Sequence, residues 1–282
     1  MAREVNIGLV QMAMQEEPEL NRRRAAELVR SAALAGAEIV CLPELFTSPY
    51  FCNVEKSPRD YAESIPGETS AFLAHTAKEH GIVLVGGSFY ERSGNRRFNT
   101  ALVFDRNGEN LGSYRKTHIP HDPSFYEQHY FEPGDTGFKV FDTSKGKIGV
   151  LICYDQWFPE AARSNALLGA EIVFYPTAIG TLEGVPESEG SWQEAWENVQ
   201  RGHAIANGMV VAAVNRVGVE GQSHFWGGSF VCDAFGKTLI RGGGEEGVFI
   251  ATVDLDHGQR VKEGWRFFYN RRPNAYHQLT QQ

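Results

Sequence analysis

An internal repeat constrains the fold of this chain more than any other feature. The five residues Gly36–Val40 read Gly-Ala-Glu-Ile-Val, and Gly169–Val173 repeat them without a change. Two residues separate each copy from a proline, Pro43 in the first and Pro176 in the second. A segment that recurs with its spacing indicates that two parts of the chain follow the same backbone path.

Each copy closes a strand–helix–strand pattern. Ile7–Val10 and Ile148–Leu151 are short apolar runs typical of buried strands, and a helical pattern lies between each run and its copy. Gly36 and Gly169 stand where a helix ends at a left-handed residue. We therefore predict an α/β fold in which two sheets, each with helices on its outer face, stack as a four-layer α-β-β-α sandwich with an internal pseudo-two-fold repeat.

Charge and composition restrict the classes of partner. The net charge at pH 7 is −8, and the one dense basic run, Arg22–Arg24, lies early in a helical pattern with acidic neighbours. Nucleic acid is therefore not expected as a partner, because phosphate binding needs a clustered positive surface. No apolar stretch is long enough to cross a bilayer, so no membrane partner is expected. No linker rich in Gly, Ser or Pro divides the chain, and we expect one domain over residues 1–282.

The cysteines and the N-terminus indicate the compartment. The four cysteines have no clustered spacing, so they predict no disulfide framework. Residues 1–5 lead directly into a strand pattern and lack the apolar region of a signal peptide. We expect a cytoplasmic protein.

Cys153 is the candidate nucleophile. It ends a predicted strand and precedes a helix that begins near Phe158, and a strand-to-helix turn exposes a side chain at the carboxyl edge of a sheet. A thiolate forms more easily than an alkoxide, especially beside a cation. The alternative is a buried structural cysteine, which is also the interpretation for the other three cysteines, Cys41, Cys52 and Cys232.

Two charged residues are candidates to assist the thiol. Glu44 follows Pro43 at the end of its strand, and a carboxylate beside a thiol has its pKa raised by desolvation and becomes a competent general base. Lys116 stands at the start of a long aromatic and His-rich loop, residues 116–137, and loops of that length are often functional. A surface acid and a solvated lysine are the alternatives.

Histidines offer a rival mechanism. His118 or His203 could be the base of a Cys–His pair. His118 and His121 could contribute to a metal site, but no third ligand has recognisable spacing, so we predict no metal.

Taken together, three segments resemble the nitrilase superfamily: Leu42–Phe46 with its Pro-Glu step, Tyr114–His118 with its Arg-Lys step, and Ile152–Asp155 with the cysteine after an apolar strand. The resemblance spans nearly the whole chain. It implies a carbon–nitrogen hydrolase domain with a Cys–Glu–Lys site rather than a Cys–His site, and no cofactor. It also implies a homodimer or larger homo-oligomer, with the tail from about residue 257 at the interface.

Further segments resemble the N-carbamoylputrescine amidases within that superfamily, chiefly Cys153–Arg163 and Phe174–Gly180. This resemblance implies cleavage of a terminal ureido C–N bond through a Cys-linked intermediate, with N-carbamoylputrescine converted to putrescine, ammonia and carbon dioxide. The chain departs from the family pattern at Tyr154, where Trp is common, and around Glu183, which lies one residue off the position of the family's ammonium-binding acid.

The resemblance assigns the site residues. Glu44, Lys116, Cys153 and Glu127 are expected to be catalytic, with Glu127 helping to place water. Substrate binding is expected from Tyr154, Thr177, Ala178, Glu183, His129 and Tyr130.

Acidic residues in the segment 183–189 would favour a small cationic carbamoyl amine as substrate. Two other functions are considered. An N-carbamoyl amino acid or β-ureidopropionate amidohydrolase would need Arg201 or Arg216 for the substrate carboxylate. A non-catalytic, nitrilase-like binding subunit would be expected to lack one of the three motif residues, and all three are present.

Overall fold

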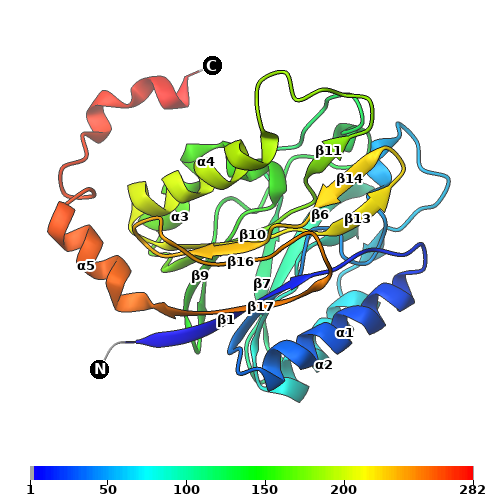
Figure 1. Cartoon of the computed structure of the whole chain (residues 1–282), viewed down its shortest axis with the longest axis horizontal. Coiled ribbons are helices and arrows are strands. Elements are labelled where there is room, and N and C mark those ends of the chain that lie inside the picture. Colours follow the sequence, from blue (N-terminus) through cyan, green and yellow to red (C-terminus); the bar gives the residue numbers. More distant parts are fainter. Residues whose placement is uncertain (1–2, 282) are drawn as a thin grey trace.

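Two β-sheets lie face to face in the middle of the molecule, with helices on the outer face of each, as Figure 1 shows. The computed structural model describes residues 3–281. The layers run from α1 and α2, through the two sheets, to α3 and α4. This is the predicted four-layer α-β-β-α sandwich, and the prediction is confirmed.

The first sheet has the order β17-β1-β2-β4-β6-β5-β3, with β7 paired to β6. Its strands are β1 (Glu4–Gln11), β2 (Ile39–Cys41), β3 (Glu63–Ser64), β4 (Val83–Val85), β5 (Phe89–Ser93), β6 (Arg96–Phe104), β7 (Asn110–Arg115) and β17 (Gly247–Asp254). Its helices are α1 (Pro18–Leu34) and α2 (Glu68–His80).

The second sheet has the order β16-β15-β12-β10-β9-β8. Its strands are β8 (Val140–Thr143), β9 (Gly146–Val150), β10 (Ile172–Pro176), β12 (Val210–Val214), β15 (Phe230–Cys232) and β16 (Thr238–Arg241). Its helices are α3 (Pro159–Leu167) and α4 (Trp192–Asn207). A small sheet of β11 (Gly180–Leu182), β14 (Ser223–Trp226) and β13 (Val217–Glu220) lies at its edge.

The repeat appears in the strand registers. In the first sheet β1 and β2 are parallel and pair Ile7 with Ile39, and in the second sheet β9 and β10 are parallel and pair Ile148 with Ile172. A helix connects the strands of each pair, and a glycine with positive φ, 91° at Gly36 and 96° at Gly169, follows it. The two halves therefore reach the ends of their strands by the same path.

Alternating side chains divide β1 between two cores. Ile7 and Leu9 lie in the cluster between the sheets, whereas Val10 belongs to the cluster under α1 and α2. Gly8 faces α1, because a Cβ there would lie 3.2 Å from the Cβ of Ala32 in that helix. Both faces of the sheet are buried, as is usual where parallel strands are covered by helices.

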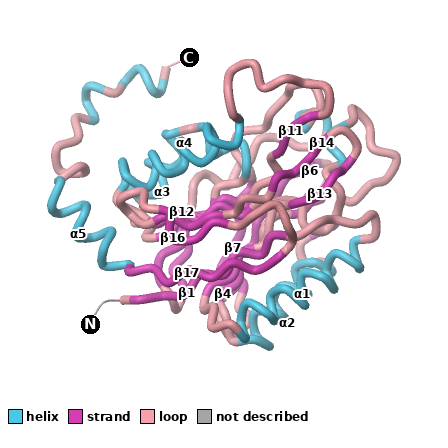
Figure 2. Tube along the Cα trace, viewed as in Figure 1, coloured by secondary structure: helices cyan, strands magenta, loops and turns pink. Residues whose placement is uncertain are grey.

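Two segments differ from a plain repeat. The strand expected to continue to Cys153 ends at Val150, and a 3₁₀ turn over Cys153–Trp157 precedes α3. At the C-terminus, α5 (Leu255–Trp265) leads into an arm, residues 266–281, that Figure 2 shows extended along the outside of the molecule. None of the described helices is long and apolar enough to span a bilayer.

Candidate active site

Four segments distant in sequence bring Glu44, Lys116, Glu127 and Cys153 to one place. Glu44 follows β2 of the first sheet, and Cys153 follows β9 of the second. Lys116 comes directly after β7, and Glu127 begins a 3₁₀ turn, Glu127–His129, in the long loop. The carboxyl ends of strands from both sheets therefore meet at this site.

Lys116 connects the two carboxylates. Its Nζ donates hydrogen bonds to Glu44 Oε1 at 2.9 Å and to both oxygens of Glu127, at 2.9 and 2.7 Å. All three side chains have no exposed surface. Burial by itself would lower the pKa of Lys116, but the carboxylates of Glu127 and Glu44 outweigh it and raise that pKa well above its usual value. The ammonium is a fixed positive charge in the site.

Glu44 is held through one of its two carboxylate oxygens. Asn99 Nδ2 donates to the same Oε1 that Lys116 contacts, at 2.9 Å. The backbone N–H of Lys116 donates in turn to the carbonyl of Asn99. The second oxygen of Glu44, Oε2, is buried and has no hydrogen-bond partner among the residues that the structure describes. An unbonded carboxylate oxygen in a buried site can accept a proton from a reacting group.

Glu127 shares the site as a second, differently placed carboxylate. Tyr50 Oη donates to its Oε1 at 2.8 Å. Burial, opposed by Lys116 and reinforced by the charge of Glu44, raises the pKa of Glu127 to about 7. Near neutral pH both the protonated and the ionised form of Glu127 are therefore populated.

Cys153 faces a cavity beside this cluster. Its side chain is only 9% exposed, its Sγ donates a long contact of 3.9 Å to the carbonyl of Ala178, and its φ is 42°. A left-handed conformation at a non-glycine residue is strained and is common at functional sites.

The thiol of Cys153 does not have a lowered pKa. Burial and the nearby carboxylate of Glu44 raise its pKa well above the usual value, against the opposing charge of Lys116. Beside these carboxylates the thiol is therefore mainly protonated near neutral pH. Attack by this thiol requires a base to accept its proton as the new bond forms.

The cavity above Cys153 has a volume of about 680 Å³. Charged side chains on its wall are all acidic: Asp122, Glu127 and Glu189. In the part of the chain that the structure describes, no Lys or Arg lines it. The apolar part of the wall is formed chiefly by Tyr50, Phe125, Tyr154, Trp157, Ile179, Leu182, Val185 and Trp192.

Of the expected substrate-binding residues, two line the cavity and four do not. Tyr154 and Ala178 are on its wall. Thr177 is fully buried, and its hydroxyl donates to the carbonyl of Tyr175 at 2.9 Å. Glu183 is exposed to solvent away from the cavity wall, and Glu189 of the same loop is the acid that reaches it. Sequence position could not distinguish the two, because loop conformation decides which side chain turns inward.

His129 and Tyr130 also lie away from the cavity. Tyr130 Oη donates to the carbonyl of Val54 at 2.7 Å, and His129 Nδ1 is 3.3 Å from the carbonyl of Glu55. Both side chains tie the long loop to residues 54–55 instead of facing the thiol.

The rival histidines have structural partners. His118 Nδ1 lies 2.7 Å from Asp155 Oδ1, and its ring stacks on Phe158 at 3.6 Å between centroids. His203 Nε2 lies 2.8 Å from the carbonyl of Gln156, and burial lowers its pKa. Neither histidine lines the cavity at Cys153. Among the described residues no group of three or more His, Cys, Asp or Glu side chains is arranged to hold a metal ion.

The arginines considered for a substrate carboxylate are also occupied elsewhere. Arg201 Nε donates to the carbonyl of Gly236 at 2.9 Å. Arg216 is fully buried, and its guanidinium contacts backbone carbonyls and Glu220. Neither is on the cavity wall.

Tyr50, Asn99 and Gln156 are site residues that sequence reasoning missed. Tyr50 and Asn99 bond Glu127 and Glu44, and Gln156 lines the cavity while its Oε1 accepts a bond from Trp196 Nε1 at 2.8 Å. No spacing signal marks the first two. Gln156 lies in the segment after Cys153, which could have suggested it.

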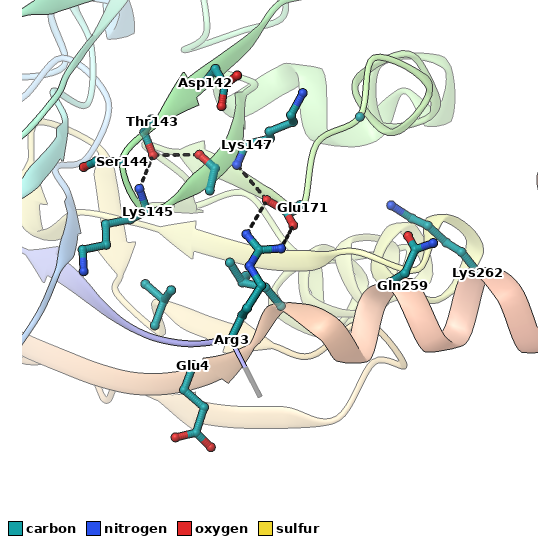
Figure 3. A pocket seen from close by; sticks show the side chains of 14 residues that line it. Arg3, Glu4, Asp142, Thr143, Ser144, Lys145, Lys147, Glu171, Gln259 and Lys262 are labelled. Carbon is teal, nitrogen blue, oxygen red and sulfur yellow. Dashed lines mark hydrogen bonds and ion pairs between the residues drawn. The ribbon is translucent and has the colours of Figure 1, made fainter. Parts of the chain in front are cut away.

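A second cavity, of about 600 Å³, lies at the opposite ends of the strands (Figure 3). Its wall includes residues at the start of β9 and residues just before β10. There the guanidinium of Arg3 donates to the carboxylate of Glu171 at 2.7 Å. Lys147 and Lys262 also line this cavity, and no cysteine is among the described residues that line it. The cavity at Cys153 is therefore the candidate active site.

Comparison with known proteins agrees with this geometry. Residues 6–263 match the carbon–nitrogen hydrolase family. N-carbamoylputrescine amidase of Solanum lycopersicum is 42% identical over 284 residues, which cover 96% of this chain and 93% of the relative. The citrullinase of Francisella tularensis is 36% identical and covers 98% of both sequences. A solved carbon–nitrogen hydrolase from Helicobacter pylori has a TM-score of 0.92 at 39% identity and covers 99% of both chains. The resemblance to the nitrilase superfamily and to the N-carbamoylputrescine amidases is confirmed.

Proposed function

Because this chain belongs to the carbon–nitrogen hydrolase family, we propose that it hydrolyses the terminal ureido group of a cationic carbamoyl amine, N-carbamoylputrescine. Membership of the family makes it a carbon–nitrogen hydrolase enzyme. The products are putrescine, ammonia and carbon dioxide.

The acidic wall of the cavity is the observation that carries this proposal. Glu189 and Asp122 line the cavity together with Glu127, and no basic side chain of the described residues lines it. A protonated amine is attracted to such a wall, whereas a carboxylate is repelled. Glu189 replaces Glu183 as the proposed partner of the distal ammonium, because Glu183 does not line the cavity.

The first half of the reaction forms a covalent intermediate. Glu44 accepts the thiol proton through its unbonded Oε2 while Cys153 Sγ attacks the ureido carbon. The backbone N–H of Tyr154 donates a hydrogen bond to the negative oxygen that develops. The buried ammonium of Lys116 stabilises the same oxygen through its positive charge. Loss of one such donor costs about 2.7–4 kcal/mol of barrier. Glu44 then returns the proton to the terminal nitrogen, which leaves as ammonia, and a carbamoyl thioester remains on Cys153.

The second half of the reaction releases the amine. A water molecule gives a proton to Glu44 and attacks the thioester carbon, with Glu127 helping to orient it. The C–S bond breaks, and Cys153 regains its proton from Glu44. The resulting carbamic acid decomposes to the amine and carbon dioxide. No cofactor or metal enters these steps.

Other ureido compounds are the alternatives. Citrulline carries a distal ammonium as well as a carboxylate, and a relative is named as a citrullinase. N-carbamoyl amino acids and β-ureidopropionate end in a carboxylate, which Arg201 and Arg216 are not placed to bind.

Ammonia release by the purified protein from N-carbamoylputrescine, citrulline, β-ureidopropionate and an N-carbamoyl-D-amino acid tests the proposal. The highest kcat/KM is expected for the first substrate. A preference for β-ureidopropionate or an N-carbamoyl amino acid would overturn the argument from the acidic wall. No turnover of any of the four would favour a non-catalytic binding subunit.

We also propose that the segment from about residue 257 packs against a second copy of the chain. Trp265 and Tyr269 are 60% and 76% exposed, and Trp265 stacks on the ring of Phe235 at the surface. A large exposed apolar surface of this kind often marks a site of contact with another protein chain. The replacement of both Trp265 and Tyr269 by Ser is expected to lower the molar mass measured by light scattering, and an unchanged mass would contradict the proposal.

A further inference from the structure

Two consecutive buried residues in the link between β12 and β13, Asn215 and Arg216, take no part in the proposed chemistry. Neither has any exposed surface. Neither side chain lines the cavity at Cys153. A buried arginine charge is costly unless it is neutralised and fully used, so the contacts of this pair need a reason.

Arg216 holds the turn that carries Glu44. Its Nη2 donates to the carbonyl of Glu44 at 2.7 Å and to that of Leu45 at 3.0 Å. Leu45 has a positive φ of 47°, a conformation that persists only where its surroundings enforce it. The guanidinium therefore fixes the backbone from which the Glu44 carboxylate projects.

The same guanidinium is connected to the far side of the cluster. Its Nη1 donates to both oxygens of Glu220, at 2.8 and 3.0 Å, and the Glu220 carboxylate accepts the backbone N–H of Tyr50. Tyr50 in turn donates its hydroxyl to Glu127. One ion pair thus supports the segments that position both carboxylates.

Asn215 holds the equivalent turn of the other half. Its Oδ1 accepts the N–H of Ile179 at 3.0 Å, and its Nδ2 donates to the Ile179 carbonyl at 2.8 Å. Ile179 follows Ala178, whose carbonyl accepts the contact from Cys153 Sγ. The amide therefore pairs with both backbone groups of Ile179, the residue after the one that contacts the thiol.

We infer that Asn215 and Arg216 are positioning residues that set the distance between the two turns, Arg216 on the side of the proton acceptor and Asn215 on the side of the thiol. Because they are adjacent in the chain, the two turns are tied to a single peptide. A displacement of about 1 Å between reacting groups can cost roughly a hundredfold in rate. The inference rests on the proposed roles of Glu44 and Cys153, although not on the identity of the substrate.

The Arg216→Lys variant tests the Arg216 half. Lysine keeps the charge near Glu220 but cannot reproduce a planar fork that reaches two carbonyls. We expect kcat to fall about a hundredfold with KM within threefold, and the pH–rate profile to shift because the cluster of carboxylates is displaced. The matched control is Arg163→Lys, since Arg163 Nη2 also bonds a backbone carbonyl, that of Ala206, and neither residue lines the cavity at Cys153. It is expected to retain kcat.

The Asn215→Ser variant tests the other half and serves if Arg216→Lys does not fold. Each variant is compared by its near-ultraviolet circular dichroism and thermal midpoint, so that loss of folded protein is corrected before kcat is compared. A folded variant with kcat within threefold of the parent and an unshifted pH profile would overturn the inference. So would a fall in activity that only follows the folded fraction.

The substrate assignment can fail separately. If the parent protein hydrolyses another ureido or amide compound, the same comparison is made with that compound. If it hydrolyses none, the proposed function fails, and the rate of Cys153 alkylation by iodoacetamide replaces kcat. An alkylation rate changed about tenfold by Arg216→Lys, because proton acceptance by Glu44 is altered, would support the positioning role, and an unchanged rate would overturn it.

Discussion

The two halves of the molecule have the same backbone path but place different residues at matching positions. Met12 follows Ile7 by the same spacing as Cys153 follows Ile148, and Thr177 follows its strand as Glu44 follows the strand of the other half. Each half therefore has a chemically capable residue at one strand end and an inert one at the other. The comparison indicates that the duplication supplies the scaffold, whereas the chemistry requires both halves.

The largest expected effect comes from the strand end of the second half. Cys153→Ala is expected to lower kcat by roughly ten-thousandfold or more, because no covalent intermediate can form. Ammonia release measures it, and circular dichroism verifies the fold. The control is Met12→Leu at the matching position of the first half, a volume-conserving change expected to leave kcat within threefold. Near-normal activity of Cys153→Ala would end the assignment of the nucleophile.

At the second pair of matching positions, Glu44 and Thr177, the residue of the first half is expected to be the one that matters for activity. Glu44→Gln removes the proton acceptor while it keeps the size of the side chain, and kcat is expected to fall about a thousandfold. Thr177→Ser at the matching position retains the hydroxyl that bonds the carbonyl of Tyr175, so it is expected to be nearly silent. If the Thr177 variant lost as much activity as the Glu44 variant, the division of roles between the halves would be wrong.

The pH dependence tests the carboxylate cluster of the first half. The pKa of Glu127 is raised to about 7, so its carboxylate takes up a proton as pH falls below that value and no longer accepts bonds from both Lys116 and Tyr50. We expect kcat/KM to fall about tenfold per pH unit below that pKa. The Glu127→Gln variant should be slower and lack this limb. If kcat/KM of Glu127→Gln fell over the same pH range as in the wild type, the titrating group would be another residue.

The raised pKa of Glu127 also affects the stability of the folded protein. Because the pKa of Glu127 in the folded protein lies above its ordinary value of 4.5, protonation favours the folded state. The contribution of this group to the free energy of unfolding is fully present below pH 4.5 and is lost as pH rises through about 7. Chemical denaturation of wild type and Glu127→Gln between those values measures the difference, and the opposite sign would contradict a raised pKa.

The smallest expected effect lies in the loop of the second half. Glu189→Gln is expected to raise KM for N-carbamoylputrescine about fivefold, with kcat unchanged, because solvent screens an exposed ion pair and keeps its contribution to binding small. Glu187→Gln, in the same loop but not on the cavity wall, is the matched control. Equal effects of the two variants would indicate a general acidic field instead of a contact with Glu189.

The fold could be predicted from the sequence because the repeat fixes strand ends, helix ends and their spacing. The repeat also predicts that Glu44 and Cys153 lie at strand ends close to each other. The motif resemblance predicts Lys116 and Glu127 as further site residues. These are properties of local segments and their order. They do not depend on how any one loop folds.

The remaining features depend on tertiary contacts. Arg216 was considered for a substrate carboxylate, but it contacts the carbonyl of Glu44, which lies far away in sequence. Glu189 rather than Glu183 reaches the cavity because of the path of one loop. The raised pKa of the Cys153 thiol follows from burial, which no spacing reveals.

The central claim is that Cys153 of one half forms a covalent bond to the substrate, while Glu44 of the other half accepts the thiol proton. Mass spectrometry tests this claim most directly. The protein is mixed rapidly with N-carbamoylputrescine, quenched in acid during turnover and digested. We expect the peptide with Cys153 to gain the mass of the substrate less one ammonia, and Cys153→Ala to show no adduct. Ammonia release with Cys153 unmodified at every quench time, or with the adduct on another residue, would contradict the account.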